Sequence, residues 1–293
     1  MLHIITDSSC DLPKELLRQY HIHVVPLTVV IDGKEYTEGV DITPQEFYQK
    51  MLGASSLPRT SQPSPLAFAK IFEETAGNGS LLCLTISSKL SGTYQSACMA
   101  QDLSGVSVTV FDTWAGSLGV GLQAIRAAEL AAQGLGVEKI VERLTAYRGE
   151  MNILILIDTL ENIVKGGRLS KFQGSVAKVL GIKVLLEGVE GSVELLEKIR
   201  GRNKFLQRAI DIIGERRKDL ANTTFGITHV DNLADAEYLK ELIEERYHPQ
   251  DVIINYMGST MGTYAGKGGM IVSFCRFILM VQLAGLLPSA NRN

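Results

Sequence analysis

The chain of 293 residues is long enough for one large or two ordinary domains, and its 45% hydrophobic and 21% charged residues are typical of a globular protein. Its 29 basic and 32 acidic residues include no basic stripe, which argues against nucleic acid as a partner. Four widely spaced cysteines without a CxxC pair indicate reduced thiols, and no secretory signal is evident, so a cytoplasmic location is expected.

Strand and helix signals alternate from the N-terminus to about residue 160, the pattern of a parallel sheet with crossover helices. Four apolar runs each end in a short cluster of Thr, Asp or Ser: residues 2–9, 81–88, 106–113 and 153–159. Because the carboxyl ends of parallel strands open on one crevice, these clusters predict a polar site there. Such residues are also ordinary helix N-caps, an alternative that stays open for each of them.

Residues 22–42, approximately, predict a small β insertion, because two strand-like stretches flank the turn sequence Asp32-Gly33. Thr43-Pro44-Gln45-Glu46 has the residue types of a capping box with proline at the first helical position. The stretch 54–65 is rich in Ser and Pro and predicts an irregular loop. It is either a surface linker or a loop that is ordered by the helix beginning at Ser64-Pro65.

The predicted fold class is α/β with two domains. Residues 1–160 form an N-terminal Rossmann-like parallel sheet flanked by helices, and residues 161–274 form an α+β domain. In the second domain we expect strands over 193–198, 224–230 and 252–257 and helices over 203–218 and 235–247. Residues 275–293 are an apolar C-terminal extension, too short and interrupted to span a bilayer comfortably. We expect it to pack as a terminal helix, with a transient membrane or partner contact as the alternative.

The familiar catalytic motifs GxSxG, HExxH, the EF-hand loop and GxGxxG do not occur, so neither a metal nor a cofactor is expected. One cation is well placed: Gly166 and Gly167 stand directly before Arg168, at a turn that leads into a predicted helix. A guanidinium at a helix start suits a carboxylate or a phosphate. The alternative is that the glycines end a helix and that Arg168 pairs with a surface acid.

Four short motifs occur in one order along residues 2–274. They are Thr6-Asp7-Ser8-Ser9, Thr60-Ser61-Gln62-Pro63-Ser64, the stretch ISSKLSGTY over 86–94, and 158–170 with its Gly-Gly-Arg-Leu-Ser end. Together they resemble the DegV family. The resemblance implies a two-domain protein, itself not an enzyme, that binds one long-chain fatty acid between its domains. It also implies a bacterial carrier that presents the carboxylate to the catalytic subunit of a separate fatty acid kinase, for acyl-phosphate formation and phospholipid synthesis.

The resemblance also implies roles for single residues. Thr60 and Ser91 match the positions whose hydroxyls hold the fatty acid carboxylate, with Ser61 and Gly92 beside them. Arg168 matches the arginine associated with the head group and its phosphorylation. These chemistries fit, because hydroxyls can hold a carboxylate and an arginine can offset the larger charge of an acyl phosphate.

The chain departs from the family near its end. Tyr264 and Lys267 stand where the family carries the histidine and proline of a His-x-Gly-Pro-Gly turn, so Tyr264 is expected at the ligand. A neutral phenol can hydrogen-bond, but it cannot share charge as an imidazolium does near neutral pH. The departure therefore concerns the phosphoryl-handling half of the implied function.

Two other functions compete with the carrier. One is a serine-dependent hydrolase of a lipid or acyl substrate, with Ser8, Ser87 or Ser91 as nucleophile and Asp7 or His229 as helper. It requires a serine–base pair within reach. The other is a non-enzymatic, lipid-sensing regulatory module.

Overall fold

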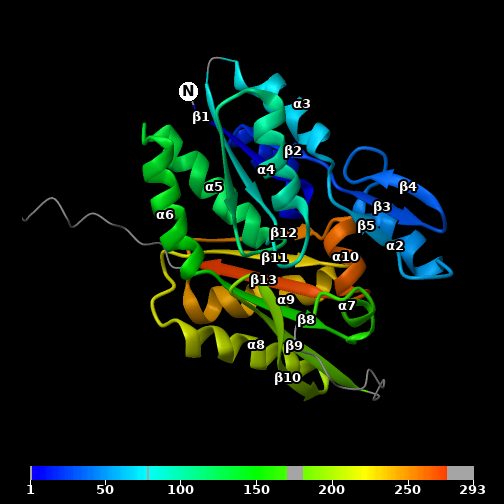
Figure 1. Ribbon diagram of the computed structural model, residues 1–293. Coiled ribbons are helices and arrows are strands. Elements are labelled where there is room, and N and C mark those ends of the chain that lie inside the picture. Colours follow the sequence, from blue (N-terminus) through cyan, green and yellow to red (C-terminus); the bar gives the residue numbers. More distant parts are fainter. Residues whose placement is uncertain (1, 78, 170–180, 276–293) are drawn as a thin grey trace, which may run out of the picture.

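The computed structural model describes residues 2–77, 79–169 and 181–275, which fold into two large sheets and one small sheet (Figure 1). The strands are β1 (Leu2–Asp7), β2 (Ile22–Val25), β3 (Thr28–Ile31), β4 (Lys34–Thr37), β5 (Arg59–Ser61), β6 (Ser80–Thr85), β7 (Val108–Asp112), β8 (Asn152–Ile157), β9 (Ile182–Val189), β10 (Ser192–Arg200), β11 (Thr224–His229), β12 (Asp251–Tyr256) and β13 (Met270–Cys275). The helices are the short 3-10 helix η1 (Ser8–Cys10), α1 (Lys14–Gln19), α2 (Pro44–Gly53), α3 (Pro65–Ala76), α4 (Thr93–Ser104), α5 (Leu118–Ala132), α6 (Val137–Gly149), α7 (Glu161–Lys165), α8 (Arg202–Arg216), α9 (Leu233–Tyr247) and α10 (Ser259–Ala265).

The N-terminal half contains a parallel sheet with the strand order β2-β1-β6-β7. Helices α3 and α4 cover one face, where Phe68, Phe72 and Ala97 pack on β1 and β6 residues such as Ile5 and Leu81. Helices α5 and α6 lie on the opposite side (Figure 1). The expected α/β architecture, with helices on both faces of a parallel sheet, is thus confirmed.

The small sheet has the order β4-β3-β5 and is antiparallel throughout. Its hairpin turns at Asp32 and Gly33, both with positive φ (47° and 83°), as a tight two-residue hairpin requires. The predicted capping box is present, because the Thr43 hydroxyl accepts a hydrogen bond from the Glu46 N–H at 3.3 Å. The predicted insertion begins too early in the chain, since residues 22–25 form β2 of the parallel sheet. Strand β5 instead comes from the Ser/Pro-rich loop, which is therefore ordered there.

The C-terminal half contains a mixed sheet of the order β10-β9-β8-β13-β11-β12, in which only β11 and β12 run parallel. The expected strands and helices after residue 190 are all present as β10, α8, β11, α9 and β12. One assignment was wrong: the run at 153–159 forms β8 in this sheet and does not belong to the parallel sheet. The second sheet therefore begins before the expected division near residue 160.

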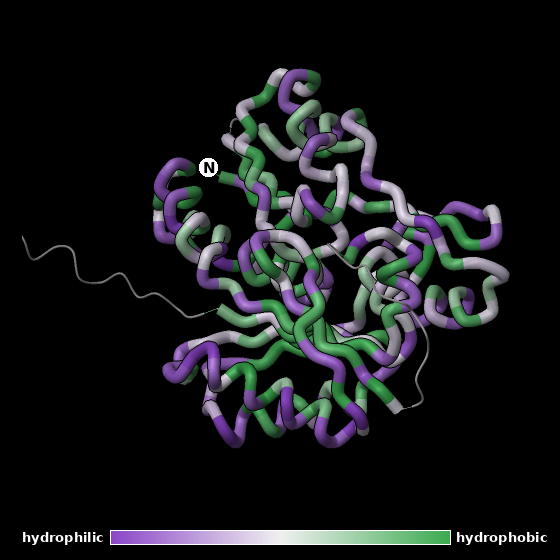
Figure 2. The backbone as a smooth tube through the Cα atoms, turned by 60° about the horizontal axis from the view of Figure 1, so that its bottom comes forward, coloured by the Kyte–Doolittle hydropathy of each residue, from purple (hydrophilic) through white to green (hydrophobic). Residues whose placement is uncertain are grey.

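Strand β8 is apolar on both faces because both are covered. Leu154 and Leu156 pack with α8 and α9, whereas Ile153, Ile155 and Ile157 face the core shared with the N-terminal half. Figure 2 shows the hydrophobic residues concentrated in the central strands, with polar and apolar residues alternating in the outer helices. An unbroken apolar run indicates a strand buried on both sides, but not which sheet it joins.

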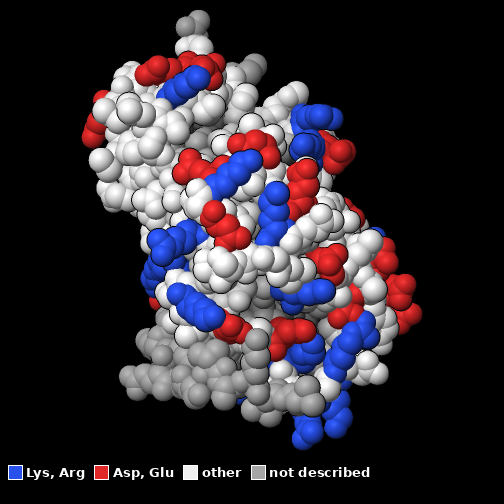
Figure 3. Space-filling view, turned by 90° about the vertical axis from the view of Figure 1, so that its right-hand side faces the viewer, with Lys and Arg blue, Asp and Glu red and all other residues white. Residues whose placement is uncertain are grey.

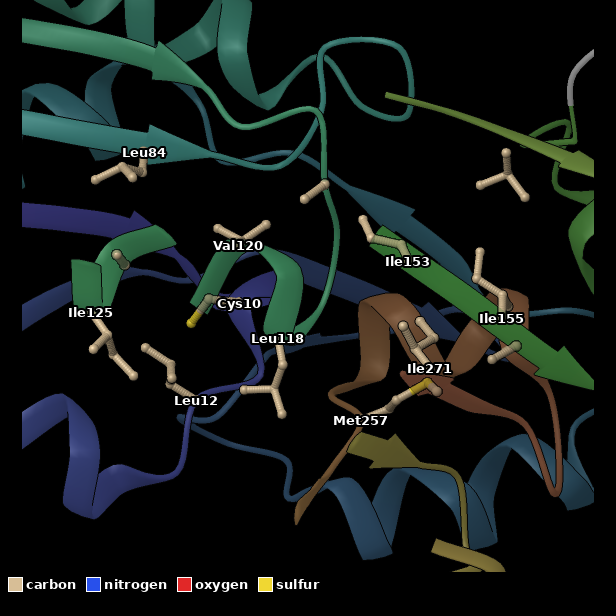
Figure 4. Packing of buried hydrophobic residues seen from close by; sticks show 14 of the residues in the cluster. Cys10, Leu12, Leu84, Leu118, Val120, Ile125, Ile153, Ile155, Met257 and Ile271 are labelled. Carbon is tan, nitrogen blue, oxygen red and sulfur yellow. The ribbon is translucent and has the colours of Figure 1, made fainter. Parts of the chain in front are cut away.

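Helix α5 lies between the two large sheets and contacts β1, β2 and β6 on one side and β11 and β13 on the other. Residues 118–125 are all buried. Figure 4 shows Leu118, Val120 and Ile125 of this helix among core residues from both halves. Contact with β11 is especially close, since a Cβ added at Gly226 would lie 2.6 Å from the Leu118 Cβ.

Other expectations concern the surface and the residues beyond the described ranges. Lys/Arg and Asp/Glu are interspersed on the face drawn in Figure 3, as expected for a chain without a basic stripe. Among the described residues, none of the helices is both long enough and apolar enough to cross a bilayer. The helix expected after Arg168 and the extension 275–293, apart from Cys275, lie outside the described residues.

We predict that Gly226→Ala destabilises the fold by about 1–3 kcal/mol, because the new methyl group overpacks the junction of α5 and β11. Leu118→Gly removes the Cβ atom that the new methyl group meets, so the double variant should be less destabilised than the sum of the two single variants. Urea unfolding of the single and double variants measures this coupling. Gly53→Ala is the matched control, since nothing lies within 4 Å of its new Cβ. Strictly additive effects of Gly226→Ala and Leu118→Gly would contradict the contact.

Candidate functional site

The Asp7 carboxylate at the end of β1 points into the protein. It accepts hydrogen bonds from the N–H groups of Ser9 (3.0 Å) and Ile86 (2.8 Å) and from the Ser9 hydroxyl (2.5 Å). Burial raises the pKa of Asp7 to about 6, in spite of these hydrogen bonds, which act in the opposite direction. Asp7 therefore caps the short helix after β1 and ties β1 to the end of β6.

Several hydroxyls of the strand-end clusters form hydrogen bonds that hold segments of the fold together. Ser8 donates to Glu38 at 2.5 Å, and Ser87 donates to the carbonyl oxygen of Gly191 at 2.7 Å. Ser88 donates to Asp112 at 2.5 Å. These three hydrogen bonds join separate parts of the fold and are not helix caps, so the capping alternative is seen at β1 only for Asp7.

The geometry does not favour the hydrolase hypothesis. His229 is buried, its Nδ1 accepts from the Asn232 N–H at 3.2 Å, and burial lowers its pKa. Ser91 exchanges a hydrogen bond with the Thr93 hydroxyl at 2.9 Å. Among the described residues, none of Ser8, Ser87 and Ser91 is hydrogen-bonded to Asp7 or His229, the helpers that the hypothesis names.

A cavity of about 60 Å³ lies where the three sheets meet. Its buried walls come from β8, β13, α7, α10, β10 and the segment after β6, and they are apolar except for Thr260, whose hydroxyl donates to Glu38. Its other polar members Thr60, Ser91, Arg168 and Tyr264 are half-buried, so they mark the end that opens toward solvent. Among the described residues, the lining is Thr60, Ile86, Leu90, Ser91, Ile155, Ile157, Ile163, Arg168, Val193, Thr260, Met261, Tyr264, Ala265 and Ile271.

Thr60 and Tyr264 close this polar end. The Thr60 hydroxyl and the Tyr264 phenol share a hydrogen bond of 2.6 Å across 204 residues of sequence. Thr60 reaches it from β5 of the small sheet and Tyr264 from α10. A carboxylate entering here could accept from both hydroxyls once their mutual hydrogen bond opened.

The Arg168 guanidinium stacks over the Tyr264 ring, 5.0 Å from its centroid. Its Nε donates to the Leu90 carbonyl oxygen at 3.2 Å and its Nη1 to that of Gly166 at 2.5 Å. Within the described chain it is held by main-chain carbonyls and an aromatic face and forms no ion pair with a carboxylate. Among the described residues, the alternative of a surface ion pair for Arg168 is therefore not seen.

Glycine at position 166 permits this arrangement. A Cβ there would lie 2.4 Å from the Tyr264 ring, so a larger residue would push the ring away. Gly167, with φ of 71°, makes the tight turn that was expected before Arg168. The two glycines thus determine the positions of the Tyr264 ring and the Arg168 guanidinium.

Two of the six expected ligand residues do not line the cavity. Ser61 follows Thr60 in β5 and is exposed, because successive side chains of a strand point to opposite faces. Gly92 is also exposed, and Gln62 packs closely against it. Lys267 is exposed as well and lies outside the lining.

Sequence reasoning missed Glu38, which holds the first turn of α10. Its carboxylate accepts hydrogen bonds from the Thr260 N–H (2.7 Å) and from the hydroxyls of Ser259 and Thr260 (both 2.9 Å), in addition to Ser8. It is only 7% exposed and links the parallel sheet, the small sheet and α10. No local signal marks it, since the hydroxyls that it holds are some 220 residues away along the chain.

Comparison with known proteins confirms the resemblance drawn from the four motifs. The DegV family model matches residues 1–276. A DegV domain-containing protein of Caldanaerobacter subterraneus is 33% identical over 273 residues, which are 92% of this chain and 97% of the relative.

Two solved structures of the family are also similar to this chain. A DegV family protein from Thermus thermophilus, described as fatty acid binding, aligns with a TM-score of 0.88 at 30% identity over 94% of this chain and 99% of its own. One from Eubacterium eligens, loaded with heptadecanoic acid, aligns with a TM-score of 0.84 at 25% identity over the same shares.

We predict that Asp7 makes the fold less stable as the pH rises. Its folded pKa of about 6 exceeds its ordinary value of 3.8, so its contribution is complete below pH 3.8 and is lost as the pH rises through about 6. The difference in unfolding free energy between the wild type and Asp7→Asn should fall by on the order of 3 kcal/mol from acid to neutral pH. Urea unfolding over this range measures it, and parallel pH profiles would refute the prediction.

Proposed function

The chain belongs to the DegV family, and on this basis we propose that it binds one long-chain fatty acid in the cavity between its two large sheets. The observation that carries the proposal is the cavity itself, whose buried walls are apolar except for Thr260, which is hydrogen-bonded to Glu38, and whose other described polar residues lie at the half-buried end. The fatty acids bound by the two similar structures support the same ligand class. The carboxylate would lie at Thr60, Ser91, Arg168 and Tyr264.

Affinity and orientation would come from different parts of the site. At roughly 0.8 kcal/mol per buried CH₂, about fourteen methylenes would contribute on the order of 11 kcal/mol before the costs of ordering the chain. The hydroxyls and the guanidinium would then fix which end lies at the mouth. A carboxylate between Thr60 and Tyr264 would replace their mutual hydrogen bond, so neither hydroxyl would lose a partner.

We further propose that the protein is a cytoplasmic carrier that presents the carboxylate to a fatty acid kinase and does not itself catalyse. Arg168 would offset the added charge of an acyl phosphate. Tyr264 in place of histidine would leave the arginine as the cation at the head group, since Lys267 does not line the cavity. The transient membrane contact considered for residues 275–293 stays an expectation.

We predict that the protein as purified carries one fatty acid, which native mass spectrometry and solvent extraction would identify. Thr60→Val with Ser91→Ala should lose it, because each hydrogen bond to a charged group contributes about 1.5–3 kcal/mol, or roughly 10- to 100-fold in affinity. The matched control, Thr145→Val with Ser107→Ala, changes exposed residues away from the cavity. An empty wild type that also takes up neither added oleate nor palmitate would refute the proposal.

The kinase step can be tested separately. With a fatty acid kinase catalytic subunit and ATP, we expect Arg168→Gln to lower acyl-phosphate formation at least about tenfold, and to lower bound fatty acid less, because the phosphorylated head group carries more charge. Acyl phosphate is measured by trapping with hydroxylamine and bound acid by extraction. Equal losses of both, or unchanged acyl-phosphate formation, would contradict the proposed role of Arg168.

A further inference from the structure

The cavity is small for a long acyl chain. Its volume of about 60 Å³ is well below the roughly 300–1,000 Å³ usual for ligand pockets. A chain such as the heptadecanoic acid of the Eubacterium eligens protein would need more room. Some part of the lining must therefore move if this chain holds an acid of that length.

Most of the lining is too stiff to make that room. Ile155 and Ile271 face each other across the β8–β13 pair and form the floor, where Figure 4 shows them close together. Their branched side chains have restricted rotamers, as do those of Ile86, Ile157 and Ile163. The floor strands lie in the middle of a sheet that is covered on both faces, so the backbone has little freedom there.

Met261 is the most flexible of the apolar side chains among the described lining residues. It lines the cavity from α10, it is half-buried, and its unbranched thioether has several rotatable bonds. Its side chain reaches the segment before α5, where a Cβ added at Gly116 would lie 2.8 Å from the Met261 Cε and 3.3 Å from its sulfur. The absence of a side chain at Gly116 thus leaves room for the end of Met261. The Ile86 Cδ1 borders the same space, 3.9 Å from a Cβ added at Gly116.

We propose that Met261 determines the acyl chain length that this site accepts. With the thioether under Gly116, the methyl end of the ligand stops short of this gap. Acids about two methylenes longer bind when the Met261 side chain turns aside and the methyl end of the ligand takes its place against Gly116 and Ile86. This inference rests on the proposed fatty acid binding and adds the residue that sets its selectivity.

The test is a series of saturated acids, octanoate, dodecanoate, palmitate and stearate, whose dissociation constants are measured by calorimetry on delipidated protein. Met261→Phe places a stiff ring in the gap and should weaken palmitate and stearate at least about tenfold relative to octanoate, the effect of losing room for about two methylenes. Gly116→Ala should act in the same direction, because its methyl group displaces the Met261 thioether toward the cavity.

The control is Met99→Phe, which changes an exposed methionine on α4, 52% accessible and outside the cavity lining. It should leave the ratio of palmitate to octanoate affinity at the wild-type value. The same unchanged ratio in both Met261→Phe and Gly116→Ala would overturn the assignment of Met261 while leaving fatty acid binding intact. A wild type that binds no acid of the series would instead refute the proposed function, and this inference with it.

Discussion

The burial of helix α5 between the two large sheets is the constraint on which the rest of the structure depends. Residues 118–125 are buried on all sides, and the helix contacts strands of both sheets. Gly226 lets β11 approach the helix at Leu118. The contact of the β11 backbone with the Leu118 side chain therefore sets the distance between the sheets. The cavity floor includes Ile271 of β13, the strand next to β11, and the position of this floor therefore depends on packing that a ligand cannot easily change.

A second constraint fixes the segments around the cavity mouth. Glu38 holds the first turn of α10, and Asp11 accepts from the Gly258 N–H just before that helix (2.7 Å) and from the Ser117 hydroxyl at the start of α5 (2.6 Å). Asp11 and Ser117 both have positive φ (50° and 55°). Asp tolerates the left-handed region, whereas the Ser117 conformation (ψ of −145°) is unfavourable for serine and persists because the surrounding hydrogen bonds hold it. The carboxylates of Glu38 and Asp11 thus anchor α10, which carries Tyr264 and Met261, to the small sheet and the parallel sheet.

Local sequence predicted most elements and the mouth residues that the family motifs mark, but not how distant segments combine. The apolar run of β8 has the same composition whether it joins a parallel or an antiparallel sheet, and only its partners β9 and β13, which follow it in the chain, decide the matter. Glu38 was missed for the same reason, since its hydrogen-bond partners on α10 lie some 220 residues away. Ser61 was placed at the ligand by its position beside Thr60, although alternation along a strand turns neighbouring side chains to opposite faces.

The two parts of the proposed site differ in how they would adapt to a ligand. At the mouth, Thr60, Tyr264 and Arg168 already hold one another, so binding would exchange hydrogen bonds and rebuild little. In the interior, the floor is stiff, and the flexible Met261 side chain lines the cavity from α10 and reaches Gly116. An anion would therefore be recognised by preformed groups, whereas chain length would be read by one movable side chain. This division lets a single fold keep its carboxylate site while its selectivity for chain length changes through a single residue of α10.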